Sequence, residues 1–289
     1  MNTMIDSRNR LIFDTSGLNA LSDDKDSVAI TTCLGIGSRV RLTETNLAEI
    51  GATRNPERRA KLLSICQRLV GAGECIGPYH WIVEQQIKLH AARPDVFNWQ
   101  RVEVRVPALE AEVARPELLT DDALAAAMCA DFEKAGDEFD QLFRGAREAF
   151  PIPKDERIQI TLADTIESLE VDGSPHWRMA ADIYEQNAQQ RPSEAEVRAF
   201  IMLCPPFSMM MLSSIMAQFH RSVRDFRFPA LYRAGLLDLL SAVYLPYCDR
   251  FVTHDDGQYN ALKALTAQAG LRTEVTTYHA FRESWLIAA

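Results

Sequence analysis

Two short apolar runs at opposite ends of the chain each lead into an acidic residue, and they limit the fold more than any other feature. The run LIF at residues 11–13 leads into Asp14, and the run RFV at residues 250–252 leads through Thr253 and His254 into Asp255. Apolar runs of this length, bounded by cap-forming and turn-forming residues, are typical of buried strands. Functional groups in open α/β sheets gather outside the carboxyl ends of the strands. We therefore predict that both ends of the chain join one sheet and that Asp14 and Asp255 face one crevice.

Helix-start signals follow the strand signals. A further strand signal, RVRL at residues 39–42, precedes a predicted helix that either Thr43 or Thr45 caps. Ser193 and Glu196 have the spacing of a capping box, in which each side chain accepts a hydrogen bond from the other residue's backbone amide.

Strand signals are concentrated at the two ends of the chain, whereas its middle carries mainly helical patterns. The economical architecture is an α/β core that a helical insertion interrupts. We predict that residues 1–105 form the first part of the core, residues 106–225 the insertion and residues 226–289 the second part of the core.

The net charge restricts how the chain binds nucleic acid. The 289 residues carry a formal net charge of −9, with 47% hydrophobic and 25% charged residues, as in an ordinary soluble globular protein. A protein that binds nucleic acid through a broad basic face is normally positive. Any nucleic-acid contact of this chain therefore needs local basic groups, with carboxylates collected elsewhere, for example around a metal ion.

One uncharged segment, residues 199–219, is as long as a membrane-spanning helix. Pro205 and Pro206 lie inside it, and they interrupt a helix because proline lacks an amide donor and clashes with the preceding turn. We expect buried helices of a soluble protein here and no membrane contact. The N-terminus has no signal-peptide pattern and the six cysteines form no C-x-x-C pair, which predicts reduced thiols in the cytoplasm.

Four acidic residues stand out by their positions in the predicted elements. Asp14 and Asp255 follow strands, whereas Glu49 and Asp238 lie on helices. Mg²⁺ and Mn²⁺ prefer oxygen ligands, and carboxylates within ~5 Å of one another repel unless a cation neutralises them. If the four converge, a divalent metal ion is close to a physical requirement. Each also has a structural alternative, since Asp14 can cap a helix, Asp255 can end a strand, and the other two can be solvated charges on a helix face.

Three segments contain these acids: LIFDTSGLNAL, RLTETNLAEIGAT and LLDLLSAVYLPYCDRFVTHD. Together they resemble the PIN-like nuclease family, and the last also resembles a bacterial PIN-like branch. The resemblance covers residues 10–55 and 230–280 and leaves the middle of the chain uncovered. It implies a three-layer α/β/α fold with a central parallel sheet, and Mg²⁺- or Mn²⁺-dependent hydrolysis of phosphodiester bonds, mostly in RNA.

The resemblance implies four catalytic residues that bind the metal: Asp14, Glu49, Asp238 and Asp255. The choice of the third and fourth acid stays open, because Asp249 and Asp256 compete for these places. Asp256 is followed by a glycine, and that pair is also typical of a turn.

Other polar residues lie next to these acids in the sequence. Ser16, Thr253 and Asp256 are candidates for supporting positions, where a hydroxyl group holds a ligand carboxylate or a phosphate, although plain helix capping explains them equally well. Phosphate-backbone contacts are expected from four flanking arginines: Arg54, Arg58, Arg59 and Arg224. The alternative for these arginines is a solvated helix face paired with neighbouring acids.

The leading hypothesis is a metal-dependent PIN-like endoribonuclease with RNA as its substrate. The competing hypothesis is a non-catalytic PIN-like scaffold whose helical insertion recruits a protein partner. An inhibitory or recruiting protein partner is compatible with either hypothesis. A phosphate-binding loop of the G-x-x-x-x-G-K-[ST] type is absent, and so is the D-x-D pair of an aspartyl-phosphate phosphatase, because position 16 is a serine.

Overall fold

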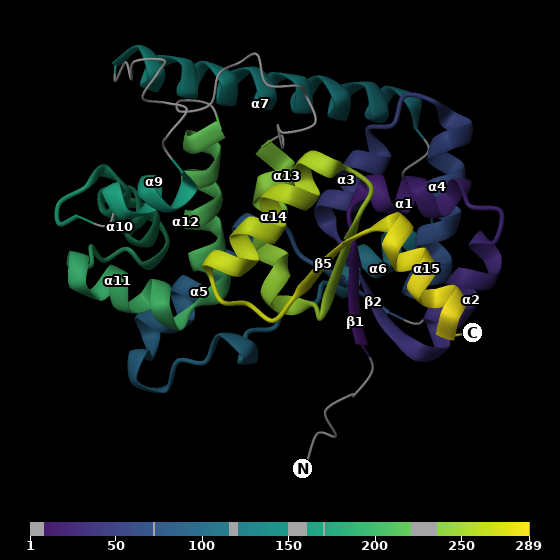
Figure 1. The fold of residues 1–289 in the computed structure, drawn as a ribbon, viewed down its shortest axis with the longest axis horizontal. Helices are drawn as coiled ribbons and strands as arrows, with labels where there is room; N and C mark the ends of the chain where they lie inside the picture. Colours follow the sequence, from purple (N-terminus) through teal and green to yellow (C-terminus); the bar gives the residue numbers. More distant parts are fainter. Residues whose placement is uncertain are drawn as a thin grey trace.

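The structure is a computed structural model, and it describes residues 9–71, 73–115, 121–149, 161–169, 171–220 and 236–288. Within them, five parallel strands form one sheet in the order β3-β2-β1-β4-β5. The strands are β1 (Asn9–Phe13), β2 (Ser38–Thr43), β3 (Glu74–Ile76), β4 (Arg250–Thr253) and β5 (Glu274–Thr277). The predicted α/β class with a central parallel sheet is confirmed, and both ends of the chain contribute strands to it (Figure 1).

Strand β1 occupies the centre of the sheet, between β2 and β4. Leu11 pairs with Val40 on one side and with Arg250 on the other. Successive side chains of a strand point to opposite faces, so Ile12 joins one hydrophobic cluster whereas Leu11 and Phe13 join another. Leu11, Ile12 and Phe13 are all buried, which explains why the second half of this strand is an apolar run in the sequence.

One face of the sheet is covered mainly by helices that follow the first two strands and by the last helix of the chain. These are α1 (Thr15–Asp23), α2 (Ser27–Gly37), α4 (Pro56–Val70) and α15 (Tyr278–Ala288). Helix α6 (Pro107–Ala114) packs against α4 and β3. The ring of Phe13 packs edge-to-face against Phe281 of α15, with 5.2 Å between the ring centroids. This layer is therefore anchored directly on the central strand.

The opposite face is covered by α5 (Tyr79–Ala92), α12 (Pro205–Gln218), the 3₁₀ segment η6 (Ser241–Tyr247) and α14 (Asp256–Gln268). Their hydrophobic cluster joins Ile12 and Phe251 of the sheet to Phe207 and Met209 of α12, and none of these four side chains is more than 1% exposed. Helices on both faces of the sheet are compatible with the expected three-layer arrangement.

The described part of residues 106–225 is helical and supplies part of this second cluster. Besides α6 and α12 it contains α7 (Asp122–Ala149), α9 (Leu162–Leu169), α10 (Pro175–Ala188) and α11 (Glu194–Leu203). Phe200 of α11 is fully buried, and its ring centroid lies 4.6 Å from that of His90 and 5.1 Å from that of Phe207. The helical segment and the sheet thus share one hydrophobic core.

Helix α7 lies on the side of the sheet toward which the strands run (Figure 1). It contacts α3 (Glu44–Gly51), the helix that follows β2. Arg59 of α4 bonds to Asp122 at the start of α7, and Arg54 pairs with Glu133 at 2.6 Å. These ion pairs hold the first half of α7 against α3 and α4.

The helix starts follow from local capping. The Thr43 hydroxyl accepts a hydrogen bond from the amide of Asn46, whose side chain in turn accepts from the amide of Thr43, both at 3.0 Å. Of the two threonines proposed as caps, the structure therefore selects Thr43, and Thr45 lies inside α3. The predicted capping box of Ser193 and Glu196 starts α11. Shorter elements are η1 (Pro94–Val96), η2 (Trp99–Arg101) and α13 (Leu236–Leu240).

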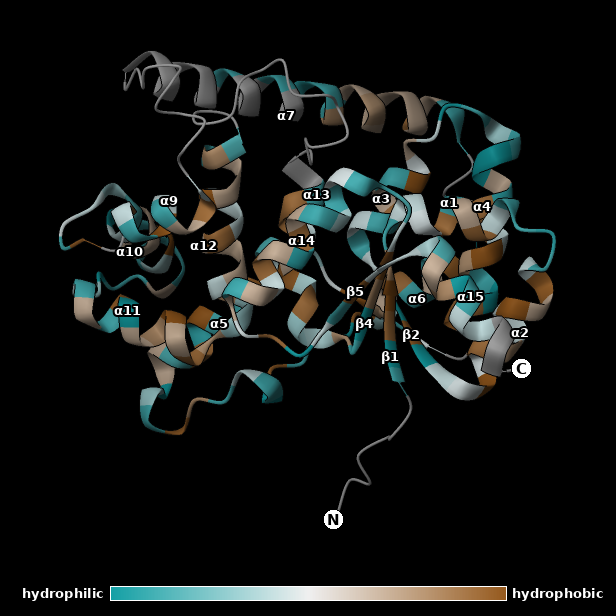
Figure 2. Cartoon of the chain, in the orientation of Figure 1, coloured by the Kyte–Doolittle hydropathy of each residue, from teal (hydrophilic) through white to brown (hydrophobic). Residues whose placement is uncertain are grey.

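The uncharged segment forms the end of α11 and all of α12, and Figure 2 shows α12 as largely hydrophobic. The two helices break at Cys204 and meet at an angle of 109°. Over the described stretches of the chain, no single helix is long and apolar enough to cross a membrane, and these two meet the length and composition criteria only as a bent pair.

Candidate functional site

Asp14 directly follows the central strand and caps helix α1. Its Oδ1 accepts a hydrogen bond from the amide of Gly17 at 2.6 Å, and its Oδ2 accepts from the hydroxyls of Ser16 at 2.7 Å and Thr253 at 2.9 Å. The residue is only 8% exposed. Three donors thus hold the carboxylate in one orientation at the carboxyl end of the sheet, and both hydroxyl groups predicted to support it do so.

Thr253 links Asp14 to a glutamine that the sequence did not identify as part of the site. The Thr253 hydroxyl lies 2.7 Å from Oε1 of Gln258, and its single proton can go either to this oxygen or to Asp14. Nε2 of Gln258 donates to the backbone carbonyl of Asp238 at 3.4 Å. Gln258 is 1% exposed, and it connects the ends of two strands to the helix that carries Asp238.

Glu49 reaches the same edge of the sheet from α3. The side chain is half-buried, and the hydroxyl of Thr15 donates a hydrogen bond to its carboxylate. The side-chain amide of Asn46 donates a hydrogen bond to this hydroxyl at 3.3 Å. Because Thr15 immediately follows Asp14, the same strand end that carries the first acid also positions the second.

The charges of three predicted acids act on one another. Burial raises the pKa of Asp14 to about 6, and the negative charge of Asp238 raises it further, against the effect of the three hydrogen bonds. Burial also raises the pKa of Glu49 to about 7, with additional increases from the charges of Asp238 and Asp14. Asp14, Glu49 and Asp238 therefore lie near one edge of the sheet, and the ionised forms of Asp14 and Glu49 are disfavoured there.

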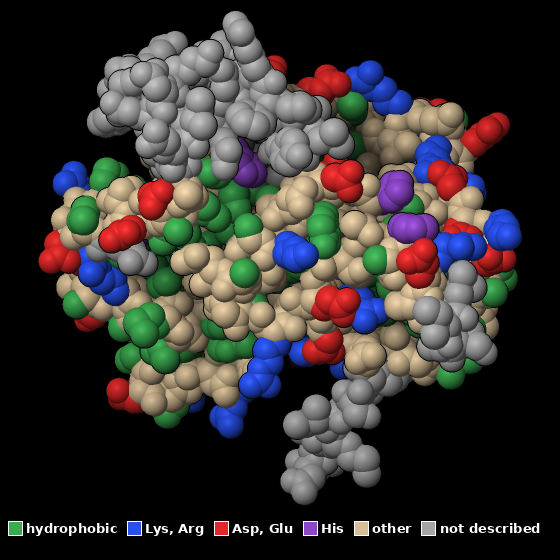
Figure 3. All heavy atoms as spheres, in the orientation of Figure 1, with side chains coloured by type: hydrophobic (Ala, Val, Ile, Leu, Met, Phe, Trp, Pro, Cys, Tyr) green, Lys and Arg blue, Asp and Glu red, His purple; other side chains and the backbone are tan. Residues whose placement is uncertain are grey.

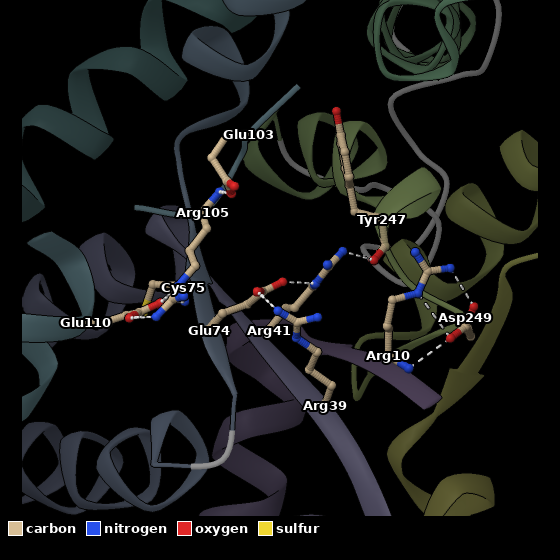
Figure 4. Close-up of polar contacts among 10 residues, drawn as sticks. All are labelled: Arg10, Arg39, Arg41, Glu74, Cys75, Glu103, Arg105, Glu110, Tyr247 and Asp249. Atoms are coloured by element: carbon tan, nitrogen blue, oxygen red, sulfur yellow. Dashed lines mark hydrogen bonds and ion pairs between the residues drawn. The ribbon is translucent and has the colours of Figure 1, made fainter. Parts of the chain in front are cut away.

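Asp249, the alternative third acid, lies at the opposite edge of the sheet. It precedes β4 and binds Arg10 at the start of β1, with 2.8 Å from the backbone amide and 2.7 Å from the guanidinium (Figure 4). Arg39, Arg41 and Glu74 form ion pairs near this pair (Figure 4). Parallel strands place all their amino ends on one edge, so Asp249 cannot join a site at the carboxyl ends, and Asp238 is the third acid of the cluster.

Asp255 and Asp256 both lie at the start of α14, and both side chains are exposed. Oδ1 of Asp255 accepts a hydrogen bond from the amide of Gln258 at 2.7 Å, which makes Asp255 the N-cap of this helix. Its charge is not among the causes that shift the pKa of Asp14 or Glu49. The structure thus gives Asp255 a capping role, as it gives Asp14, and the place of Asp255 among the metal ligands stays a prediction.

The arginines proposed to contact RNA are engaged with acidic groups. Arg54 pairs with Glu133, and Arg58 binds both Asp23 and the side chain of Asn19.

The expectation that Arg59 contacts nucleic acid is wrong for this conformation, because its side chain is 1% exposed and bonds to Asp122 and to the carbonyl of Thr53. Arg59 belongs to a basic stretch of the sequence, but its side chain points inward and contacts Asp122 at the start of α7. Arg224 lies outside the described residues.

The donor chemistry at the edge of the sheet suits a hard divalent cation. Asp14, Glu49 and Asp238 offer carboxylate oxygens, and burial together with the neighbouring acidic charges disfavours the ionised forms of Asp14 and Glu49, conditions under which Mg²⁺ or Mn²⁺ relieves the repulsion. With the side chains as they lie, no three His, Cys, Asp or Glu residues of the described segments form a group able to hold a metal ion. Binding of a cation therefore requires side-chain rotation, which the half-buried Glu49 and Asp238 allow more readily than Asp14.

Comparison with known proteins does not assign the chain to a family. No protein-family model matches the sequence, and neither the curated proteins nor the solved structures include a significant match.

Proposed function

We propose that this chain is a metal-dependent PIN-like ribonuclease whose site is built on Asp14, Glu49 and Asp238. One observation carries the proposal: at the carboxyl end of a parallel sheet, burial raises the pKa of Asp14 and of Glu49, and the charge of Asp238, from a separate part of the sequence, raises both further. Structural carboxylates are normally paired with a cation or exposed to water, because an unpaired buried charge is costly. Asp14 and Glu49 both have pKa values that burial raises, at the carboxyl end of the sheet, and such values are typical of a functional site.

Each of the three acids has a distinct part in the proposed chemistry. A bound Mg²⁺ or Mn²⁺ ion would lower the pKa of water and offset charge on a scissile phosphate. Asp14, held by three donors, provides a fixed oxygen against which the ion is located. Glu49 and Asp238, each half-buried, complete the ligand set from two helices that can adjust. Thr253 and Gln258 keep Asp14 and the backbone of Asp238 in register.

The proposal is tested by RNA cleavage and by metal-dependent stability. We expect the purified protein to cleave single-stranded RNA with Mn²⁺ and to lose this activity in excess EDTA. Mn²⁺ at 100 times its dissociation constant should stabilise the native state by about 2.7 kcal/mol, because the unfolded chain lacks the converged site. An Asp238→Asn variant should lose most of this metal-dependent rise in the melting temperature. If the protein shows no RNA cleavage and its melting temperature does not change with Mn²⁺, the nuclease proposal is refuted and the scaffold hypothesis is left.

A second prediction separates the three clustered acids from the helix cap. An Asp255→Ala variant should lose about 1 kcal/mol of stability, because the first turn of α14 loses its side-chain acceptor. We expect its Mn²⁺-dependent cleavage rate to stay within about tenfold of the wild-type rate, since its carboxylate does not contribute to the pKa values of the cluster. Chemical denaturation and single-turnover cleavage measure the two effects. A loss of activity as deep as that of an Asp14 variant would make Asp255 a ligand after all.

A further inference from the structure

A cavity of about 350 Å³ lies between the helical segment and the C-terminal end of α14. Residues of α9 to α12 form most of its wall, and Gln268 and Leu271 close it from the side of α14. Figure 3 shows hydrophobic side chains gathered between these two parts of the surface. The candidate nuclease site lies at the other end of α14, whose 13 residues span about 20 Å at 1.5 Å per residue. The cavity is therefore separate from that site.

The wall of the cavity is mainly apolar and contains a few uncharged polar groups. Met211 and Ile215 are buried members of the wall, and Trp177 contributes an aromatic ring. Three polar side chains join them: His176, Ser208 and Gln268. Within the described part of the chain, none of these three side chains makes a hydrogen bond, although His176 is only 8% exposed. In the same wall, Nε1 of Trp177 is buried without a hydrogen-bond partner among the described residues, and a buried polar atom in that state costs free energy.

None of the described residues that line the cavity carries a formal charge at neutral pH. Burial lowers the pKa of His176 to about 4, so its imidazole is neutral and offers one donor and one acceptor. Arg198, a cation beside this wall, lies over the Trp177 ring at 4.5 Å and is paired with Asp172 and Glu194. A charged ligand would thus lose its hydration without gaining a counter-charge.

We propose that this cavity is a binding site for a small, uncharged and mainly apolar molecule with one hydroxyl or carbonyl group, which hydrogen-bonds to His176 and Ser208. The volume lies at the lower end of the range for small-molecule sites, roughly 300 to 1,000 Å³. An apolar wall with a small number of polar groups is the usual composition of such sites. This proposal does not depend on the nuclease assignment, because it uses other residues at the other end of α14.

Three probes of one shape test the proposal: 2-naphthalenemethanol, 2-methylnaphthalene and 2-naphthoate. Two methionines of the wall, Met202 and Met211, report binding directly in a protein labelled with ¹³C at the methionine methyl groups. Met202→Leu and Met211→Leu variants assign the two signals. We expect the alcohol to shift both signals with saturation, the hydrocarbon to bind about two- to tenfold more weakly, and the naphthoate to bind at least about tenfold more weakly than the alcohol.

Variants distinguish the contribution of each group. His176→Phe should remove most of the preference for the alcohol over the hydrocarbon, and Ser208→Ala provides the same comparison if the histidine variant does not fold. Ser208→Phe should fill the cavity and abolish binding of the alcohol without lowering the melting temperature. Equal binding of the alcohol and the naphthoate, or no shift of either methionine signal up to the solubility limit, would overturn the proposal. A dimer that forms at high concentration and that Ser208→Phe dissociates would assign the cavity to a second copy of the chain, and would also overturn it.

Discussion

An Asp14→Asn variant is expected to lose at least about 10³-fold of the Mn²⁺-dependent RNA cleavage rate while remaining folded. The substitution keeps the shape of the side chain, and asparagine caps helices as well as aspartate does. Oδ1 of the new side chain still accepts from Gly17, and its amide group can donate to the hydroxyls of Ser16 and Thr253, which accept as well as donate. What disappears is the negative charge at the centre of the carboxylate cluster, and with it the fixed ligand oxygen.

The same substitution is expected to stabilise the metal-free protein at neutral pH. The pKa of Asp14 is raised from 3.8 to about 6 in the folded state, so the native state binds its proton more tightly than the unfolded chain does. The contribution of this group to stability is fully present below pH ~4 and is lost as the pH rises through about 6. At pH 7 in EDTA, Asp14→Asn should therefore be more stable than the wild type by about 1 to 3 kcal/mol.

Urea denaturation at pH 4, 5, 6 and 7 in EDTA measures this difference, which should grow with pH. With Mn²⁺ at neutral pH, the wild type should become more stable than Asp14→Asn, because only the wild type gains the free energy of metal binding. Ser16→Ala is the matched control: it removes one neutral donor to Asp14 and keeps the charge, so cleavage should persist at a reduced rate. Full activity in Asp14→Asn, or a variant less stable than the wild type at pH 7 in EDTA, would contradict the proposed role of this carboxylate.

A Phe200→Ala variant should lose about 3 to 5 kcal/mol of stability and still unfold in one transition. Phe200 is fully buried among the rings of His90, Phe97, Tyr184 and Phe207, so truncation leaves a cavity in the core. Its cluster also includes residues of the sheet, which ties the helical segment to the strands. The loss should therefore lower the unfolding midpoint of the whole chain.

Met202→Ala is the matched control, because Met202 lies on the same helix two residues later and is 85% exposed. We expect its stability to stay within about 0.5 kcal/mol of the wild type. Circular dichroism and tryptophan fluorescence during urea unfolding should give coincident curves for both variants. Two separate transitions, of which Phe200→Ala shifts only one, would mean that the helical segment folds independently of the sheet.

The local sequence was sufficient for the elements that depend on burial and capping. Strand β1 was predicted because a strand buried on both faces must be apolar throughout, and Ser193 with Glu196 marked the start of α11 by a bond pattern that spans one helical turn. The position of Asp14 after the strand followed from the same signals, and Ser16, two residues later, is close enough in the chain to bond to it.

Other parts of the site depend on long-range packing, which no local pattern records. Gln258 resembles any helical glutamine in the sequence, yet it is buried and bonds to Thr253 and to the backbone of Asp238. Arg59 belongs to a basic stretch, and only its contact with Asp122 explains why it points inward. Asp255 has the right neighbours for a ligand, and the structure shows that its carboxylate also caps the first turn of α14.

The sequence by itself determined that the chain forms strands at both ends and places acidic residues just beyond them, because these features depend on hydrophobic runs and on hydrogen bonds between near neighbours. Only the tertiary structure decided that Asp238 and not Asp249 joins Asp14 and Glu49. The physical reason is the direction of the strands, because in a parallel sheet all carboxyl ends lie on one edge. Asp249 comes just before β4 and Asp14 just after the neighbouring strand β1, so a whole strand length separates them.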